Sequence, residues 1–279
     1  MDSQEYLTTP EPILIDVLLD KRSVDANRRT DHRSARTEQR TVADLGVGLM
    51  ESLGYTEFAV QGGDIGAGIG SRMALQHPEK ILGLHLNYIP GSYKPASELR
   101  ENSTGEMAAY RRNAELWSRT EGAYSLQQAT RPDTLAYGLN DSPIGLCAWI
   151  LEKLHAWSAA VPGSELPFSL DEILGSFTLY WLMRTIASSV RIYRENAMIP
   201  LHLKESERIG VPVAFAHFPG EMPMPPQAYV ELGYNIVQWT EMPRGGVTLR
   251  PWRSSACWLM TSGHSSPRSR SILLRDALG

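Results

Sequence analysis

The sequence predicts an α/β fold in which a parallel sheet is interrupted by a helical insertion. Two observations favour this fold. Short, continuous apolar stretches alternate with helical patterns near both ends of the chain, as is typical of strands buried on both faces of a parallel sheet. Residues 95–200, in contrast, have helical patterns and no strand pattern. We therefore expect a core formed by residues 41–94 and 201–246, with residues 95–200 as a helical cap over the sheet.

The composition is that of a folded protein. The 279 residues are 42% hydrophobic and 21% charged, which excludes wholesale disorder. A net charge of −4 gives no global positive field, so we expect no nucleic-acid partner. The polar start, MDSQEY, does not resemble a secretory signal, and residues 173–183 are too few to cross a bilayer as a helix. We expect a cytoplasmic protein without a membrane anchor.

The two cysteines, Cys147 and Cys257, are far apart in the sequence. This spacing supports neither a disulfide framework nor a cysteine-rich zinc site. We expect no metal and no cofactor.

Residues 1–40 are interpreted as a divergent or disordered arm. Within them, residues 13–19 could form one short helix or strand. The other notable feature is a run of basic residues, which is typical of a solvated surface. These are Lys21, Arg22, Arg28, Arg29, Arg33, Arg36 and Arg40.

Regular elements are expected from Thr41 onward. Apolar side chains at spacings of three and four predict a helix with one apolar face, formed by Val42, Leu45, Leu49, Met50 and Leu53 and ended by Gly54. Short apolar stretches predict strands over residues 58–61, 81–86, 211–216 and 235–239. Helices are expected over residues 70–76, 98–121, 143–159 and 169–196.

The turn between the first of these strands and the next helix has the pattern of a nucleophile elbow. Such a turn lifts one side chain above the sheet and needs small neighbours, because the helix passes close to the strand. In Gly62–Gly66 the raised residue is Asp64, a carboxylate that can attack saturated carbon to form an ester. The backbone N–H of Ile65, at the helix N-terminus, could stabilise the anion formed when water attacks that ester. A Gly-x-Asp-x-Gly sequence alone also occurs in plain turns. The strand, helix and insertion around it favour the elbow.

Four ordered blocks, the last made of two segments, resemble the microsomal-type epoxide hydrolases, enzymes of the α/β-hydrolase fold. Residues 58–87, FAVQGGDIGAGIGSRMALQHPEKILGLHLN, resemble the elbow of that family. Residues 121–153 (EGAYSLQQATRPDTLAYGLNDSPIGLCAWILEK) and 178–195 (TLYWLMRTIASSVRIYRE) are similar to the two halves of its cap. Residues 211–221 (VPVAFAHFPGE) and 234–246 (YNIVQWTEMPRGG) are similar to the return to the sheet. The resemblance covers residues 41–246.

The resemblance implies a role for each matched residue. Asp64 matches the nucleophile, Tyr124 and Tyr193 match two cap tyrosines that bind the epoxide oxygen, and Glu221 matches the acid that orients a catalytic histidine. A phenol with a pKa near 10 can supply a proton from its neutral form at pH 7, which suits the opening of an epoxide to an alkoxide. Without the resemblance, both tyrosines would be read as ordinary cap residues. The implied substrate is a small lipophilic epoxide.

Apolar residues of the cap, three of them tryptophans, are candidates for the substrate pocket. An apolar space between cap and sheet would suit such an epoxide, and core packing is the alternative for each residue. The candidates are Trp149 and Trp181, together with Trp157 and Leu182.

The chain departs from the family pattern at both ends. No His-Gly-x-Pro oxyanion loop occurs among the 63 residues before Asp64, so we expect a truncated fold whose sheet lacks its first strands. The family's Arg-Gly-Gly-His is replaced by Arg-Gly-Gly-Val at residues 244–247, which removes the water-activating base. His202, His217 and His264 stand at other positions of the pattern and are not expected to replace it.

We interpret residues 247–279 as an aberrant tail and hypothesise a shifted reading frame. Read one base earlier, any codons for Cys257-Trp258 encode Leu and any codons for Met260-Thr261 encode Asp, and both fit the family. Sequencing codons 246–247 tests this hypothesis, and a shifted frame without the histidine would end it.

Three functions are weighed. The first is an epoxide hydrolase, impaired because the histidine is absent. The second is a non-catalytic pseudo-enzyme or gene remnant. The third is a haloalkane dehalogenase, which is disfavoured because tyrosines stand where such enzymes place indole or amide halide donors. A homo-oligomer is left open.

Overall fold

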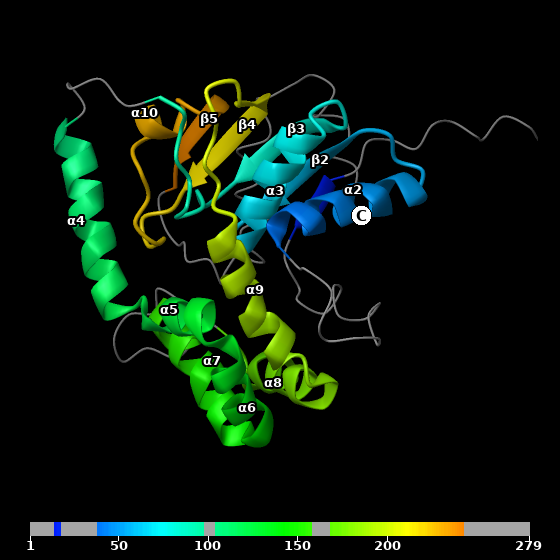
Figure 1. The fold of residues 1–279 in the computed structure, drawn as a ribbon, viewed down its shortest axis with the longest axis vertical. Coiled ribbons are helices and arrows are strands. Elements are labelled where there is room, and N and C mark those ends of the chain that lie inside the picture. The colour runs from blue at the N-terminus through cyan, green and yellow to red at the C-terminus, as the bar shows by residue number, and fades with distance from the viewer. Residues whose placement is uncertain (1–13, 18–37, 98–103, 158–167, 243–279) are drawn as a thin grey trace, which may run out of the picture.

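The structure, a computed structural model, describes residues 14–17, 38–97, 104–157 and 168–242 (Figure 1). These residues form an α/β fold with a parallel sheet, as predicted. The sheet order is β1-β2-β3-β4-β5, and every neighbouring pair is parallel. The strands are β1 (Leu14–Val17), β2 (Phe58–Gly62), β3 (Ile81–Leu86), β4 (Ile209–His217) and β5 (Tyr234–Glu241).

The two ends of the chain are described only in part. β1 lies inside the arm predicted over residues 1–40 and pairs with β2 in the register Leu14↔Ala59, so this stretch is a strand rather than a helix. The rest of the arm up to residue 37, and the tail of residues 247–279, lie outside the described residues.

Helices α2 (Gln39–Ser52) and α3 (Asp64–Gln76) pack on each other, and α3 crosses the central strands. The prediction that the apolar side chains of α2 share one face is wrong. Val42, Ala43, Val47 and Met50 face the core, whereas Leu45, Leu49 and Leu53 are 54%, 58% and 60% exposed. With 3.6 residues per turn, leucines spaced four apart follow an adjacent stripe that turns away from α3.

The cap is inserted between β3 and β4, and Figure 1 shows its helices gathered at one end of the sheet with α4 along the side. The helix expected over residues 169–196 is divided at Arg184, whose positive φ of 52° ends α8. Neither α5 nor α6 was expected as a helix. The cap helices are α4 (Thr104–Thr120), α5 (Ala123–Thr130), α6 (Pro132–Asp141), α7 (Pro143–Trp157), α8 (Leu170–Met183) and α9 (Ile186–Met198), and a short α10 (Gln227–Val230) precedes β5.

α9 joins the cap to the core through polar contacts at its C-terminal end. The buried Arg72 of α3 donates from Nη2 to the backbone oxygens of Ile199 (2.7 Å) and Pro200 (3.2 Å). The backbone N–H of Gln39 donates to Asn196 Oδ1 at 3.1 Å. These contacts hold α9, which carries Tyr193, against α2 and α3. Because α3 begins at Asp64, they also link the two predicted site residues.

None of the helices in the described ranges has the length and apolar character needed to cross a membrane.

Candidate active site

Asp64 occupies a sharp turn between β2 and α3. Its φ is 48°, in the left-handed region, where aspartate and asparagine are tolerated better than most other side chains. The helix begins at this residue, with Gly63 as its N-cap in an extended conformation. Its first backbone N–H groups, including that of Ile65, therefore lie at the N-terminal end of a helix, where the dipole favours negative charge.

The glycines before Asp64 are required by close approach. A Cβ at Gly62 would lie 2.4 Å from the backbone oxygen of Gly66, and a Cβ at Gly63 would lie 2.5 Å from Asn87 Oδ1. Neither gap admits a carbon atom. The two glycines thus allow the strand, the turn and the loop after β3 to meet at Asp64.

This crowding gives a stability prediction. Gly62→Ala should destabilise the protein by about 1–3 kcal/mol, because the added methyl group is forced against a backbone oxygen that cannot rotate away. Urea unfolding followed by circular dichroism measures the change. Gly48→Ala is the matched control, since a Cβ there has nothing within 4 Å and a mid-helix alanine should stabilise by roughly 0.5–1 kcal/mol. Equal effects at the two positions would contradict the close approach.

The structure brings the two predicted tyrosines together beside Asp64. Tyr124 comes from α5 and Tyr193 from α9, and their ring centroids are 5.8 Å apart in an edge-to-face arrangement. The side chains of Tyr124 and Tyr193 share a hydrogen bond, and Gln128 also bonds Tyr193. Burial, and then the negative charge of Asp64, raise the pKa of both phenols. Both are therefore neutral O–H groups close to the carboxylate.

Tyr88 is a third phenol at this site that the sequence analysis missed. It follows β3, whose Leu86 pairs with Gly62 at the end of β2, so it emerges next to the elbow. Its hydroxyl lies against Gly91, where a Cβ would be 3.3 Å away. Burial raises the pKa of Tyr88, and the charges of Asp64 and Glu221 add to this effect. Its position directly after a strand beside the elbow strand was the available signal.

Glu221 lies in the loop after β4, close enough to Tyr88 to affect its pKa. Its Oε1 accepts a hydrogen bond from the backbone N–H of Met222 at 3.0 Å. The carboxylate thus borders the same group of phenols as Asp64. Residue 247, where the family pattern has its histidine, lies outside the described residues.

His217 is engaged elsewhere in the sheet. Its Nδ1 lies 2.7 Å from Glu241 Oε2, and its ring lies 5.8 Å from that of Trp239. Burial alone would raise the pKa of Glu241, but hydrogen bonds from Trp239 and His217 lower it. The pairing joins β4 to β5, and the expectation that His217 is not the water-activating base stays a prediction.

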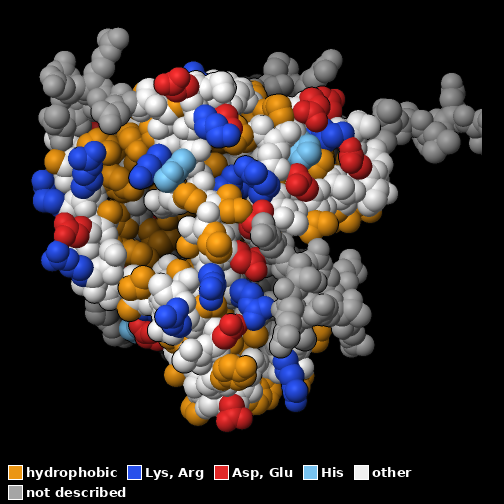
Figure 2. Space-filling model, in the orientation of Figure 1, with side chains coloured by type: hydrophobic (Ala, Val, Ile, Leu, Met, Phe, Trp, Pro, Cys, Tyr) orange, Lys and Arg blue, Asp and Glu red, His pale blue; other side chains and the backbone are white. Residues whose placement is uncertain are grey.

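The predicted pocket residues lie in different surroundings. Trp149 and Trp181 pack against the cap's own core of Ala136, Leu139, Leu146, Ile186 and Val190, so their part in a substrate pocket stays a prediction. Leu182 is exposed. Trp157 contacts Tyr124 directly, with ring centroids 4.9 Å apart. Figure 2 shows a hollow lined by hydrophobic side chains beside α4, on the side that faces the end of the sheet.

Within the described part of the chain, no group of three or more His, Cys, Asp or Glu side chains is arranged to hold a metal ion.

Sequence comparison relates the chain to curated epoxide hydrolases. The chain is 36% identical to epoxide hydrolase 1 of Oryctolagus cuniculus in an alignment of 220 residues that covers 71% of this chain. It is 33% identical to juvenile hormone epoxide hydrolase 1 of Ctenocephalides felis in an alignment of 221 residues that also covers 71% of this chain. The chain is a relative of the epoxide hydrolases. It matches none of the family models against which it was compared.

Solved structures of epoxide hydrolases have the same fold. The Aspergillus niger enzyme superposes with a TM-score of 0.68 at 25% identity, covering 84% of this chain and 59% of that one. The juvenile hormone epoxide hydrolase of Bombyx mori gives a TM-score of 0.67 at 27% identity, covering 83% of this chain and 60% of that one. The fold is therefore that of the α/β-hydrolases in a truncated form.

The chain spans just under half the length of these curated relatives. It covers 48% of the Oryctolagus cuniculus protein and 47% of the Ctenocephalides felis protein.

Proposed function

We propose that this chain opens a small lipophilic epoxide and retains it as an ester on Asp64. The observation that carries the proposal is the carboxylate on a strained elbow beside Tyr124 and Tyr193, whose pKa values it raises. A carboxylate and two neutral phenols are the groups that an epoxide needs, because its carbon is attacked while its oxygen takes up a proton.

The first step is a displacement at carbon. An oxygen of Asp64 forms a bond to an epoxide carbon, and the strained C–O bond breaks with its electron pair passing to the epoxide oxygen. That oxygen takes a proton from the Tyr124 or Tyr193 hydroxyl. The elbow presents the carboxylate and the cap presents the phenols, so the substrate is held between them.

The second step, hydrolysis of the ester to a vicinal diol, is expected to be slow or absent. Water must be activated by a base within hydrogen-bond reach of the ester, and Glu221 would orient such a base. The residue at the matched position is Val247, and His217 is paired with Glu241. The Ile65 N–H would stabilise the anion of this step if a base were supplied.

The lipophilic character of the substrate is supported by the aromatic surroundings. Trp117 and Trp157 lie edge-on to Tyr124, and a hydrophobic hollow opens beside α4 (Figure 2). The proposal includes a cytoplasmic location and the clearance of reactive xenobiotic epoxides, since opening the ring removes its reactivity toward other nucleophiles.

Product analysis tests the proposal. The full chain is incubated with excess styrene oxide, and the diol formed is counted per chain. We expect at most one epoxide consumed per chain and no steady release of diol. Continuous diol formation would mean that a base is present after all.

A non-catalytic remnant is the second candidate. In the described part of the chain the leucine stripe of α2 (Leu45, Leu49 and Leu53) is exposed, and an exposed apolar stripe is a feature of an incompletely packed core. A thermal unfolding experiment separates the two. The absence of a cooperative transition would favour the remnant.

A further inference from the structure

The ring of Tyr124 is in contact with three other aromatic rings. Trp157 lies at 4.9 Å and Trp117 at 6.4 Å between ring centroids, both edge-to-face. Tyr193 lies at 5.8 Å in the same type of arrangement. These contacts come from α4, α7 and α9, so the direction of the Tyr124 side chain depends on how those helices are held together.

Lys153 is a mostly buried cation next to this group of rings. Its side chain is 18% exposed, and its Nζ lies 5.6 Å from the centroid of Tyr124 and 5.3 Å from that of Trp157. These distances are within the range of a cation–π contact. Although burial opposes it, hydrogen bonds to Glu152 and Glu121 raise the pKa of Lys153, so the ammonium is charged.

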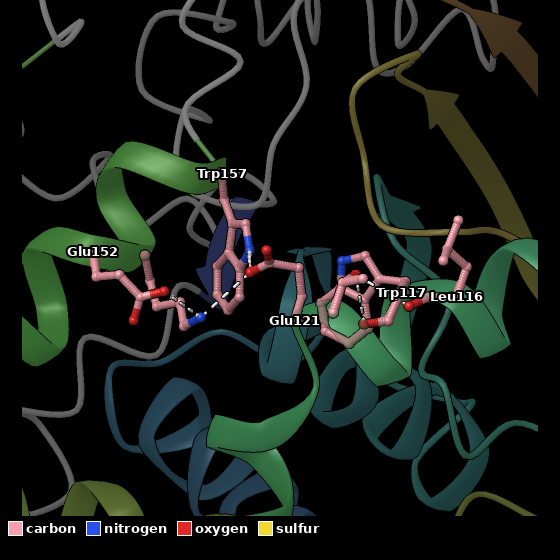
Figure 3. A network of polar contacts seen from close by, with 7 residues as sticks. Leu116, Trp117, Glu121, Glu152 and Trp157 are labelled. Atoms are coloured by element: carbon pink, nitrogen blue, oxygen red, sulfur yellow. Dashed lines mark hydrogen bonds and ion pairs between the residues drawn. The ribbon is translucent and has the colours of Figure 1, made fainter. Parts of the chain in front are cut away.

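Glu121 connects this cation to Trp157. Its Oε2 accepts a hydrogen bond from Lys153 Nζ at 3.3 Å and another from Trp157 Nε1 at 3.1 Å. Figure 3 shows the Glu121 carboxylate and the Trp157 indole pointing toward each other. Glu121 lies between α4 and α5, three residues before Tyr124, while Lys153 and Trp157 lie on α7. One carboxylate oxygen thus fixes the α4–α5 connection and the end of α7 around a single tyrosine.

The charges in this group do not cancel, because Lys153 also donates to Glu152 Oε1 at 2.9 Å and one cation is therefore shared by two carboxylates. Burial and then Asp64 raise the pKa of Tyr124, and Glu121 raises it less. The main contribution of the group to Tyr124 is therefore the ring and hydrogen-bond contacts that hold it in place. If Lys153 were removed, Glu121 would turn toward water and the Trp157 indole would lose its acceptor, because an uncompensated half-buried carboxylate is costly.

We propose that Lys153, Glu121 and Trp157 form a positioning network that holds the Tyr124 hydroxyl toward Asp64. The proposal rests on the proposed function, since the orientation of Tyr124 matters only if its proton is used. The three residues do not touch the reacting atoms and act through Tyr124.

The test combines a spectroscopic and a kinetic measurement on the full chain. 3-Fluorotyrosine is introduced at position 124, and the fluorine NMR spectrum is recorded for the native sequence, Lys153→Met and Trp157→Phe. We expect one narrow resonance in the native chain and a broadened or doubled one in both variants.

The kinetic measurement follows alkylation by styrene oxide through the intact mass of the chain. Lys153→Met should lower the maximal alkylation rate about 10-fold, while the half-saturating styrene oxide concentration changes less than about twofold.

Two further variants control the experiment. Lys80→Met removes a lysine–glutamate pair, with Glu51, that lies on the core and should change neither measurement. Glu121→Gln keeps an oxygen acceptor for Trp157 without the charge, and it should retain a narrower fluorine signal than Trp157→Phe. If Lys153→Met does not fold, Trp157→Phe remains as the disrupting variant.

The outcomes separate the two proposals. A fluorine resonance that is unchanged in folded Lys153→Met and Trp157→Phe would overturn the positioning network. If the resonance responds but the native chain is never alkylated, the network stands and the proposed function fails. A higher half-saturating concentration with an unchanged maximal rate would also overturn the network, because it would indicate a role in substrate binding alone.

Discussion

Asp64→Asn is expected to abolish covalent modification by an aryl epoxide, lowering the alkylation rate roughly 10³-fold or more. An amide oxygen is a far weaker nucleophile than a carboxylate. Asparagine has nearly the same shape and tolerates a φ of 48°, so the elbow should remain intact. Intact-mass spectrometry after incubation with styrene oxide measures the modified fraction over time.

The unfolding midpoint of the variant serves as the control for this experiment. It should stay close to that of the native chain, because the substitution removes no apolar contact. Alkylation of folded Asp64→Asn at the native rate would show that another side chain is the nucleophile.

Replacing both cap phenols is expected to have the second largest effect. Tyr124→Phe and Tyr193→Phe should each slow alkylation, and the double variant should lose about 10²–10⁴-fold, the usual contribution of a positioned acid. Each substitution removes one hydroxyl and leaves the ring packing at 5.8 Å in place. Single-turnover rates from intact mass give the comparison, with Tyr137→Phe, at an exposed cap tyrosine, as the matched control.

The pH dependence follows from the same phenols. Burial and the charge of Asp64 raise the pKa of Tyr124 and Tyr193 above 10.0, so the proton-donating neutral form is present below the raised values and lost only above them. We expect the alkylation rate to show no decline between about pH 7 and pH 10. A decline centred near pH 8 would contradict a neutral buried phenol as the donor.

Much of the fold could be predicted because parallel strands leave a local signal. Continuous apolar stretches marked β2 and β3 closely, and both strands are buried within the sheet. The burial of α2 could not be predicted, because valine, methionine and leucine are equally apolar in sequence. Only the packing of α3 decides that Val47 faces inward and Leu49 outward.

A site residue could be predicted from sequence when its type is unusual for its local pattern. The other site residues could not be predicted in this way. An aspartate in a glycine turn after a strand marked Asp64, and resemblance alone marked Tyr124 and Tyr193. Tyr88 was missed because many tyrosines follow strands, and only the pairing of β3 with β2 shows that this one emerges beside the elbow. The Lys153–Glu121 pair was missed because it joins residues 32 positions apart, which only the fold brings together.

Peptide mapping of the native chain after treatment with styrene oxide tests the central claim most directly. Trypsin should release residues 41–72 as one peptide that contains Asp64 together with Asp44, Glu51 and Glu57. We expect this peptide to gain the mass of one epoxide, and fragmentation to place the added mass on Asp64. Addition at one of the other three acids, or at a different peptide of a chain that is demonstrably folded, would contradict the account.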